Sequence, residues 1–209
     1  MAFFAFIATF TTFAALILEV FTMIGNTYNK PFLRDLYFAR LSVDSGTFID
    51  FGLWNYCTGS QGVVTMCSEP KAGFAWTQVP ELSSLIHGFE GEAKLFLAIF
   101  ILYWIAIGLT LFALTVTMLS HFRRSSDVCA SLASFVSFVV MLVVFVILLV
   151  GCLKGINVAK GTSDSISGTL GPSMWMTLGA MVGLFLSSIW YCISCCCGSG
   201  RRVRDVNKA

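Results

Sequence analysis

Long stretches without an ionised side chain constrain this chain more than any other feature. A helix that crosses the apolar core of a bilayer needs about 20 consecutive apolar residues. Stretches of about this length or longer that lack Asp, Glu, Lys and Arg occupy residues 1–18, 95–122, 128–153 and 165–200. The chain is therefore predicted to be an integral membrane protein with four transmembrane segments.

The composition and the needs of the backbone in lipid refine this prediction. Apolar residues make up 57% of the chain and charged residues 11%, whereas roughly 25% of residues are charged in a typical soluble domain. Backbone groups in lipid must be hydrogen-bonded within one segment, so each segment is interpreted as a helix. A net charge of +2 without a basic block excludes nucleic acid as a partner. The predicted helices cover about residues 3–24, 95–119, 128–153 and 174–197.

The short loops predict the orientation, because arginine and lysine accumulate on the cytoplasmic side. Arg123 and Arg124 lie between the second and third helices, and the tail of residues 198–209 contains three arginines and a lysine. Both termini are therefore expected in the cytoplasm, and residues 25–94 are expected to form an extracellular domain. The first segment has an alternative interpretation as a cleaved signal peptide, which would also leave residues 25–94 outside.

Residues 25–94 show the pattern of a small β-sheet closed by a disulfide. Short stretches of alternating apolar and polar residues, separated by glycines, predict about three to five antiparallel strands. Cys57 and Cys67 are the only cysteines of this segment, and an oxidising compartment favours a disulfide between them. Two free buried thiols are the alternative. A zinc site would need further ligands, and no histidine lies nearby, so no metal is expected.

The residues around these cysteines carry a family resemblance. Gly52-Leu53-Trp54, followed by Cys57 and Cys67, resembles the claudin signature. This resemblance implies one claudin-like tetraspan over residues 1–209, an all-α transmembrane four-helix bundle with a small extracellular antiparallel β-sheet. Claudins carry a further tryptophan early in the loop, which this chain lacks between residues 25 and 53. No residue of a paracellular pore is therefore carried over.

A second resemblance is more specific. The stretch Leu36-Tyr-Phe-Ala-Arg-Leu-Ser-Val-Asp-Ser45, together with Cys67-Ser-Glu-Pro70, is similar to the fungal Sur/PalI branch of claudin-like proteins. It implies a plasma-membrane tetraspan that organises a cortical domain or escorts a partner. Members of that branch are associated with furrow-like membrane compartments (eisosomes), cell-wall integrity and ambient-pH signalling. The expected partners are membrane lipids, including sterol or sphingolipid, and either a second copy or a larger membrane protein.

Three features inside or beside the predicted helices are candidates for function. Glu19 is an intramembrane carboxylate, which by default marks a functional polar site; alternatively it reaches the interface or bonds a neighbouring Ser or Thr. Gly179, Gly183 and Ser187 share one helix face and favour close helix packing, within the bundle or with another subunit. Cys195, Cys196 and Cys197 precede a basic cluster and are candidates for palmitoylation, or else they simply end the helix. An acylated basic tail would bind anionic inner-leaflet lipid.

No motif of an enzyme is recognised. The chain has no P-loop, no Gly-x-Ser-x-Gly and no His-Glu-x-x-His, so neither a catalytic residue nor a cofactor is predicted. The leading interpretation is a non-enzymatic membrane scaffold. The alternatives are an auxiliary subunit of a channel, transporter or membrane-bound synthase, and a small pore or transporter that uses Glu19.

Overall fold

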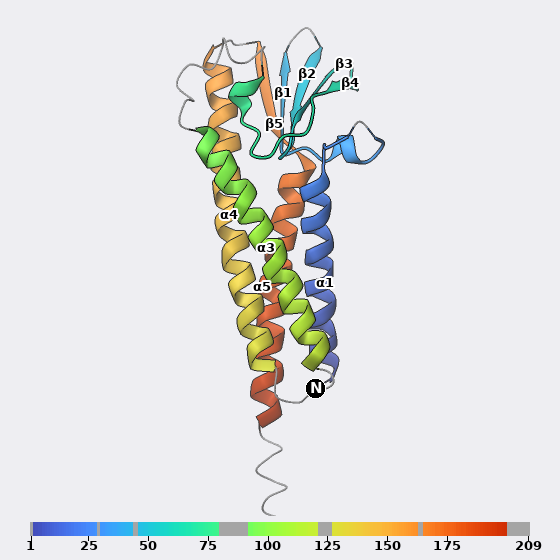
Figure 1. The fold of residues 1–209 in the computed structure, drawn as a ribbon, viewed down its shortest axis with the longest axis vertical. Coiled ribbons are helices and arrows are strands. Elements are labelled where there is room, and N and C mark those ends of the chain that lie inside the picture. The colour runs from blue at the N-terminus through green and yellow to red at the C-terminus, as the bar shows by residue number, and fades with distance from the viewer. Residues whose placement is uncertain are drawn as a thin grey trace, which may run out of the picture. The chain divides into compact units, whose positions relative to one another are not determined.

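The structure is a computed structural model that describes residues 2–28, 30–43, 46–79, 92–120, 127–162 and 165–199. Four long helices carry most of these residues (Figure 1). They are α1 (Ala2–Ile24), α3 (Glu92–Ser120), α4 (Asp127–Thr162) and α5 (Pro172–Ser199).

Each of these helices is long and apolar enough to cross a membrane. The candidate spans are Ala5–Ile24, Ala93–Met118, Cys129–Gly161 and Pro172–Ser194. Large apolar side chains are exposed on all four helices, for example Phe10, Phe112, Val146 and Phe185. A monomer in water rarely exposes so large an apolar surface, whereas in a bilayer lipid covers this surface at no cost. The protein is a multi-pass membrane protein.

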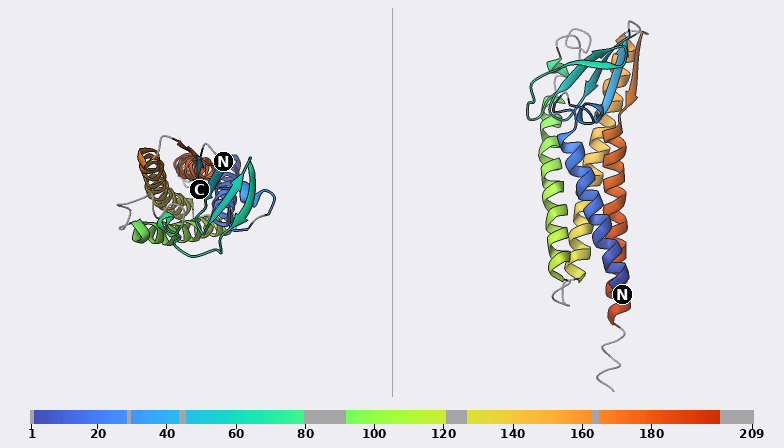
Figure 2. Two further views of the ribbon diagram at one scale, coloured as in Figure 1. Left: turned by 90° about the horizontal axis from the view of Figure 1, so that it is seen from above. Right: turned by 90° about the vertical axis from the view of Figure 1, so that its right-hand side faces the viewer.

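The strands form one antiparallel sheet, in the order β4-β3-β2-β1-β5 (Figures 1 and 2). Four strands follow α1: β1 (Ala39–Val43), β2 (Thr47–Phe51), β3 (Tyr56–Ser60) and β4 (Val63–Cys67). The fifth, β5 (Ile166–Leu170), lies between α4 and α5 and pairs with β1. The predicted fold class, four transmembrane helices with a small antiparallel sheet, is confirmed.

The largest difference from the predicted helix bounds lies at the end of α4. The helix predicted to end at residue 153 continues to Thr162, because Ile156 and Ala159 are buried and packing extends the helix beyond its charge-free stretch. The predicted third and fourth helices left residues 154–173 between them, and this stretch holds the end of α4, strand β5 and the first residues of α5. The tail of residues 200–209 lies outside the described residues.

The chain divides into two compact units. One comprises Met1–Glu19, Ile105–Leu142 and Gly179–Ala209, and is called the helix unit here. The other comprises Val20–Trp104 and Val143–Leu178, contains the whole sheet, and is called the sheet unit. Every long helix contributes residues to both units.

A buried tryptophan forms the core of the sheet unit. Trp76 lies in a short 3-10 helix (Trp76–Gln78), and its ring stacks on Phe51 of β2 at a centroid distance of 4.0 Å. Phe96 of α3 lies roughly parallel to the same ring, at 6.4 Å. Gly155 of α4 leaves room for the indole, since a Cβ there would overlap it. One ring therefore contacts the sheet and two helices.

Replacing Gly155 with alanine tests this packing. The added methyl group would meet a rigid, fully buried ring, and overpacking of this kind typically costs about 1–3 kcal/mol. Gly151→Ala is the matched control, because it lies one turn away in α4 and its Cβ would meet nothing within 4 Å. We expect Gly155→Ala to lower the thermal unfolding temperature in detergent and Gly151→Ala to leave it unchanged or raise it. Equal temperatures for the two variants would contradict the account.

Candidate functional site at the sheet–helix junction and in the helix interior

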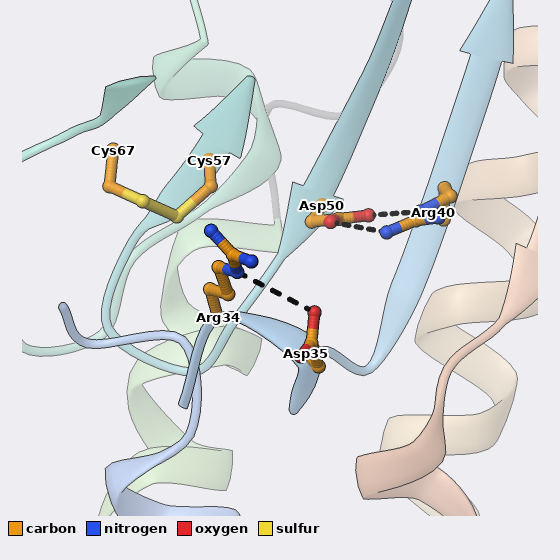
Figure 3. Close-up of polar contacts among 6 residues, drawn as sticks. All are labelled: Arg34, Asp35, Arg40, Asp50, Cys57 and Cys67. Carbon is orange, nitrogen blue, oxygen red and sulfur yellow. Dashed lines mark hydrogen bonds and ion pairs between the residues drawn. A yellow bond between two sulfur atoms is a disulfide. The ribbon is translucent and has the colours of Figure 1, made fainter. Parts of the chain in front are cut away.

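The two cysteines of the sheet are joined. Cys57 of β3 and Cys67 of β4 form a disulfide (Figure 3), and they are directly paired in the register of the two strands. Cys57 is buried together with Phe48 and Val64. The predicted disulfide is confirmed, and it ties the edge strand β4 to the body of the sheet.

The Gly52-Leu53-Trp54 motif lies in the turn between β2 and β3 and reaches the end of α1. The indole Nε1 of Trp54 donates a hydrogen bond of 2.6 Å to the carbonyl of Met23, and its ring meets Phe100 of α3 edge-on at 4.7 Å. The last carbonyls of a helix have no partner within the helix. Trp54 satisfies one of them, and the Thr27 hydroxyl satisfies the next by donating to the Ile24 carbonyl at 2.7 Å.

Two buried asparagines complete this junction. Asn26 Nδ2 donates to the Asp50 carbonyl at 3.2 Å, and Asn55 Nδ2 lies 3.3 Å from the Thr27 carbonyl and 3.1 Å from the Ser68 carbonyl. Gly52 lies between them, because a Cβ there would lie 2.9 Å from Asn26 Cβ. The motif is thus a set of contacts that hold the sheet on the helix ends. Sequence analysis missed both asparagines, although Asn26 lies two residues after the end of α1 and Asn55 directly follows the motif.

An ion pair between half-buried Arg40 and fully buried Asp50 joins the neighbouring strands β1 and β2. Arg40 of β1 donates to the Asp50 carboxylate of β2 through Nε at 2.5 Å and Nη2 at 2.8 Å (Figure 3). The guanidinium also lies over the rings of Tyr37 and Phe48, at 4.4 and 4.3 Å from their centroids. The Asp50 side chain is fully buried, and this burial raises its pKa, which the hydrogen bonds from Arg40 oppose. The same bonds raise the pKa of Arg40.

Glu19 lies in the interior of the helix unit. Its side chain is fully buried, and Thr110 of α3 places its hydroxyl 3.0 Å from Glu19 Oε1. The same hydroxyl lies 3.4 Å from Ser137 Oγ of α4. Three helices therefore meet at this carboxyl group. The sequence left open whether the Glu19 carboxyl group reaches the membrane interface or bonds a neighbouring Ser or Thr. In the structure it accepts a hydrogen bond from Thr110 and is buried.

The small residues of α5 lie against α1. A Cβ on Gly179 would be 3.5 Å from Leu18 Cδ1, and one on Gly183 would be 3.5 Å from Ala15 Cβ. Ser187 Oγ donates to the Ala8 carbonyl at 2.9 Å and is hydrogen-bonded to the Thr12 hydroxyl. These residues permit a close approach of two helices of the same chain.

Further hydroxyl pairs join helices in each unit. In the helix unit, the hydroxyl oxygens of Thr9 and Tyr191 are 3.1 Å apart. In the sheet unit, Tyr103 of α3 is hydrogen-bonded to Thr22 of α1 and lies 3.5 Å from Thr177 of α5. Sequence analysis missed these pairs, since isolated hydroxyl residues in apolar helices carry no periodic signal.

The remaining candidates lie at the end of α5. Cys195, Cys196 and Cys197 belong to α5, and their side chains are outside the described part of the structure. Cys192, one turn earlier, has an exposed thiol. Within the described residues, no group of three His, Cys, Asp or Glu side chains is placed to hold a metal ion.

Comparison with known families identifies the chain. The model of the SUR7/PalI family matches residues 4–190. The chain belongs to the SUR7/PalI family. The resemblance to the Sur/PalI branch in residues 36–45 and 67–70 is therefore confirmed, and the match reaches all four helices and the sheet. A search of curated protein sequences finds no match.

The Trp54 contact leads to a direct test. Trp54→Phe keeps an aromatic ring against Phe100 but removes the donor, and an orphaned buried carbonyl costs about 1–3 kcal/mol. Trp104→Phe is the control, because Trp104 is 51% exposed on α3. We expect a clear loss of thermal stability for the first variant and little change for the second. Similar behaviour of both would show that the Nε1 donor does not hold the junction.

The ion pair predicts a pH-dependent variant. Arg40→Met would strand a buried carboxylate, which typically costs about 3–5 kcal/mol near neutral pH. Without Arg40 the folded-state pKa of Asp50 rises further above its unfolded value, so the folded state binds more protons and stability falls as pH rises through that range. We therefore expect the loss of unfolding free energy caused by Arg40→Met, measured against wild type with denaturant, to be smaller at pH 4 than at pH 7. The double variant Arg40→Met/Asp50→Asn should lose this pH dependence.

Proposed function

We propose that this SUR7/PalI family protein is a non-enzymatic tetraspan of the plasma membrane. In this proposal it organises a cortical, eisosome-type membrane domain or supports cell-wall and pH-response signalling. The sheet faces outward, both termini lie in the cytoplasm, and the molecule acts by binding lipids, other copies or a larger membrane protein. The oxidising environment that a disulfide requires and the arginines of the opposite loop and tail both favour this orientation.

The observation that carries the proposal is how the buried polar groups of the helix unit are used. Glu19, Thr12 and Thr9 of α1 each contact a polar side chain of another helix. In lipid, such contacts hold helices together. A pore or a transport pathway instead needs polar groups aligned along an open route. Polar residues used for packing are typical of a scaffold with a fixed shape.

The tail supplies the inner-leaflet part of the proposal. Cys195, Cys196 and Cys197 are proposed sites of palmitoylation, and the arginines that follow them would attract anionic lipid at about 1 kcal/mol for each charge. The four helices already anchor the chain, so acylation and these charges would hold the tail against the inner leaflet rather than attach the protein to the membrane.

Native mass spectrometry of the protein, extracted gently from its own membrane, tests this proposal. We expect homo-oligomers with retained lipid and with acyl mass that hydroxylamine removes, and no other protein in constant ratio. A larger protein bound in fixed stoichiometry would contradict the scaffold and make the chain an auxiliary subunit. The variant with Cys195, Cys196 and Cys197 changed to serine is the control for the acyl mass.

Glu19 distinguishes the scaffold from a pore. Glu19→Gln keeps an acceptor for Thr110 but removes the ionisable group, whereas Glu19→Leu removes both. A packing role predicts near-wild-type stability for Glu19→Gln and a clear loss for Glu19→Leu, measured by thermal unfolding in detergent. Reconstituted wild-type protein should show no conductance or cation flux. A flux that Glu19→Gln abolishes would favour the pore.

A further inference from the structure

The loop between α1 and β1 is closed at its base and presents aromatic side chains at its tip. A Cβ on Gly25 would lie 2.7 Å from the Leu36 carbonyl oxygen, and the backbone N–H of Asn26 donates to the Leu33 carbonyl at 2.7 Å. Such closed loops are held in shape by their own contacts. Residues 27, 28 and 30–35, called the hook here, project sideways from the end of α1 (Figures 1 and 2).

Two large aromatic residues of the hook are exposed. Tyr28 is 61% exposed and Phe32 is 56% exposed. Phe32 also has a φ of 75° and a ψ of −50°, a backbone conformation that is an outlier for a bulky residue. Strain of this kind costs about 1–3 kcal/mol and persists where the surroundings impose it. The chain therefore holds an apolar ring outward at an energetic cost.

The ring of Phe32 continues the apolar face of α1. Phe32 meets Phe21 edge-on at a centroid distance of 5.5 Å and an angle of 83°. On the same helix end, Val20 and Ile24 are 41% and 42% exposed, and both belong to the candidate span Ala5–Ile24. This face is covered by lipid in a membrane. Phe32 therefore lies beside the end of the candidate span, next to side chains that lipid would contact in a membrane.

The charges beside the aromatic residues suit the adjoining headgroups. Lys30 is exposed, and the Arg34 side chain is 38% exposed with only a loose approach, 3.9 Å, to Asp35. Residues 27–35 thus carry two cations and one anion. Aromatic side chains with Lys or Arg beside them are the usual anchors at a membrane–water boundary.

We propose that the hook is an interfacial lipid anchor. Phe32 and Tyr28 enter the boundary between hydrocarbon and headgroups in the leaflet at the sheet end of α1, and Lys30 and Arg34 bind lipid phosphates. Since the base of the hook adjoins Asn26 and Leu36, this contact fixes the height of the sheet above the bilayer. The partner is the lipid surface itself, and the inference does not depend on the scaffold role.

Spin labels on the full-length protein in vesicles of phosphatidylcholine and phosphatidylglycerol test where the tip lies. Phe32→Cys and Val63→Cys are labelled in a background where the free cysteines are serine and the Cys57–Cys67 disulfide is kept. Val63 of β4 is the matched control, because it is apolar and 60% exposed. We expect the label at 32 to be relaxed by oxygen more than by a water-soluble nickel complex, and the label at 63 to show the reverse. A water-accessible label at both positions would overturn the anchor.

A second measurement tests the phosphate contacts without altering the aromatic residues. Electron spin resonance of spin-labelled phosphatidylglycerol and phosphatidylcholine gives the preference of the protein for the anionic lipid. We expect Lys30→Gln/Arg34→Gln to reduce this preference by about fivefold for each charge removed. Lys71→Gln, an exposed lysine after β4, is the control and should change it little. An unchanged preference in the double variant would refute phosphate binding by the hook.

Discussion

The hydrogen bond from Trp54 to the Met23 carbonyl is the contact on which the arrangement of the sheet unit depends. A helix that leaves the bilayer ends in carbonyl groups without partners, and a buried carbonyl without a donor costs free energy. Here Trp54, in the turn between β2 and β3, supplies the donor. The same hydrogen bond therefore caps the helix and holds the sheet on its end. The family motif follows from this need. Gly52 leaves room for Asn26, Trp54 donates, and the Cys57–Cys67 disulfide fixes the strands beyond the turn.

The helices of the helix unit are held together by different contacts. Lipid and apolar side chains are equally apolar, so helices in a bilayer gain little from burying leucine against leucine and associate through close packing and polar contacts. Gly179 and Gly183 let α5 approach α1, and Ser187, Thr12 and Glu19 add hydrogen bonds there and to α3. These residues therefore explain how the helices of this unit are held together.

Much of this architecture can be predicted from the sequence, because charge-free length reports directly on the bilayer. The disulfide is predicted from two cysteines in one segment that faces an oxidising compartment, and the family from residues 36–45 and 67–70. What the sequence does not reveal depends on tertiary contacts. Strand β5 is five residues long and is stabilised by pairing with β1. Trp76 has no local pattern that marks it as the core of the sheet unit, and Thr22 and Tyr103 become a pair only when their helices meet.

Amide hydrogen exchange of the intact wild-type protein in lipid nanodiscs tests the central claim most directly, which is that the sheet and the end of α1 form one cooperative unit. If Trp54 and the two asparagines join them, the amides of β1, β2 and β3 and the amide of Asn26 should open together, with one common free energy. A sheet that exchanges many times faster than Asn26, while the end of α1 stays protected, would contradict this. It would mean that the sheet opens independently of the helices.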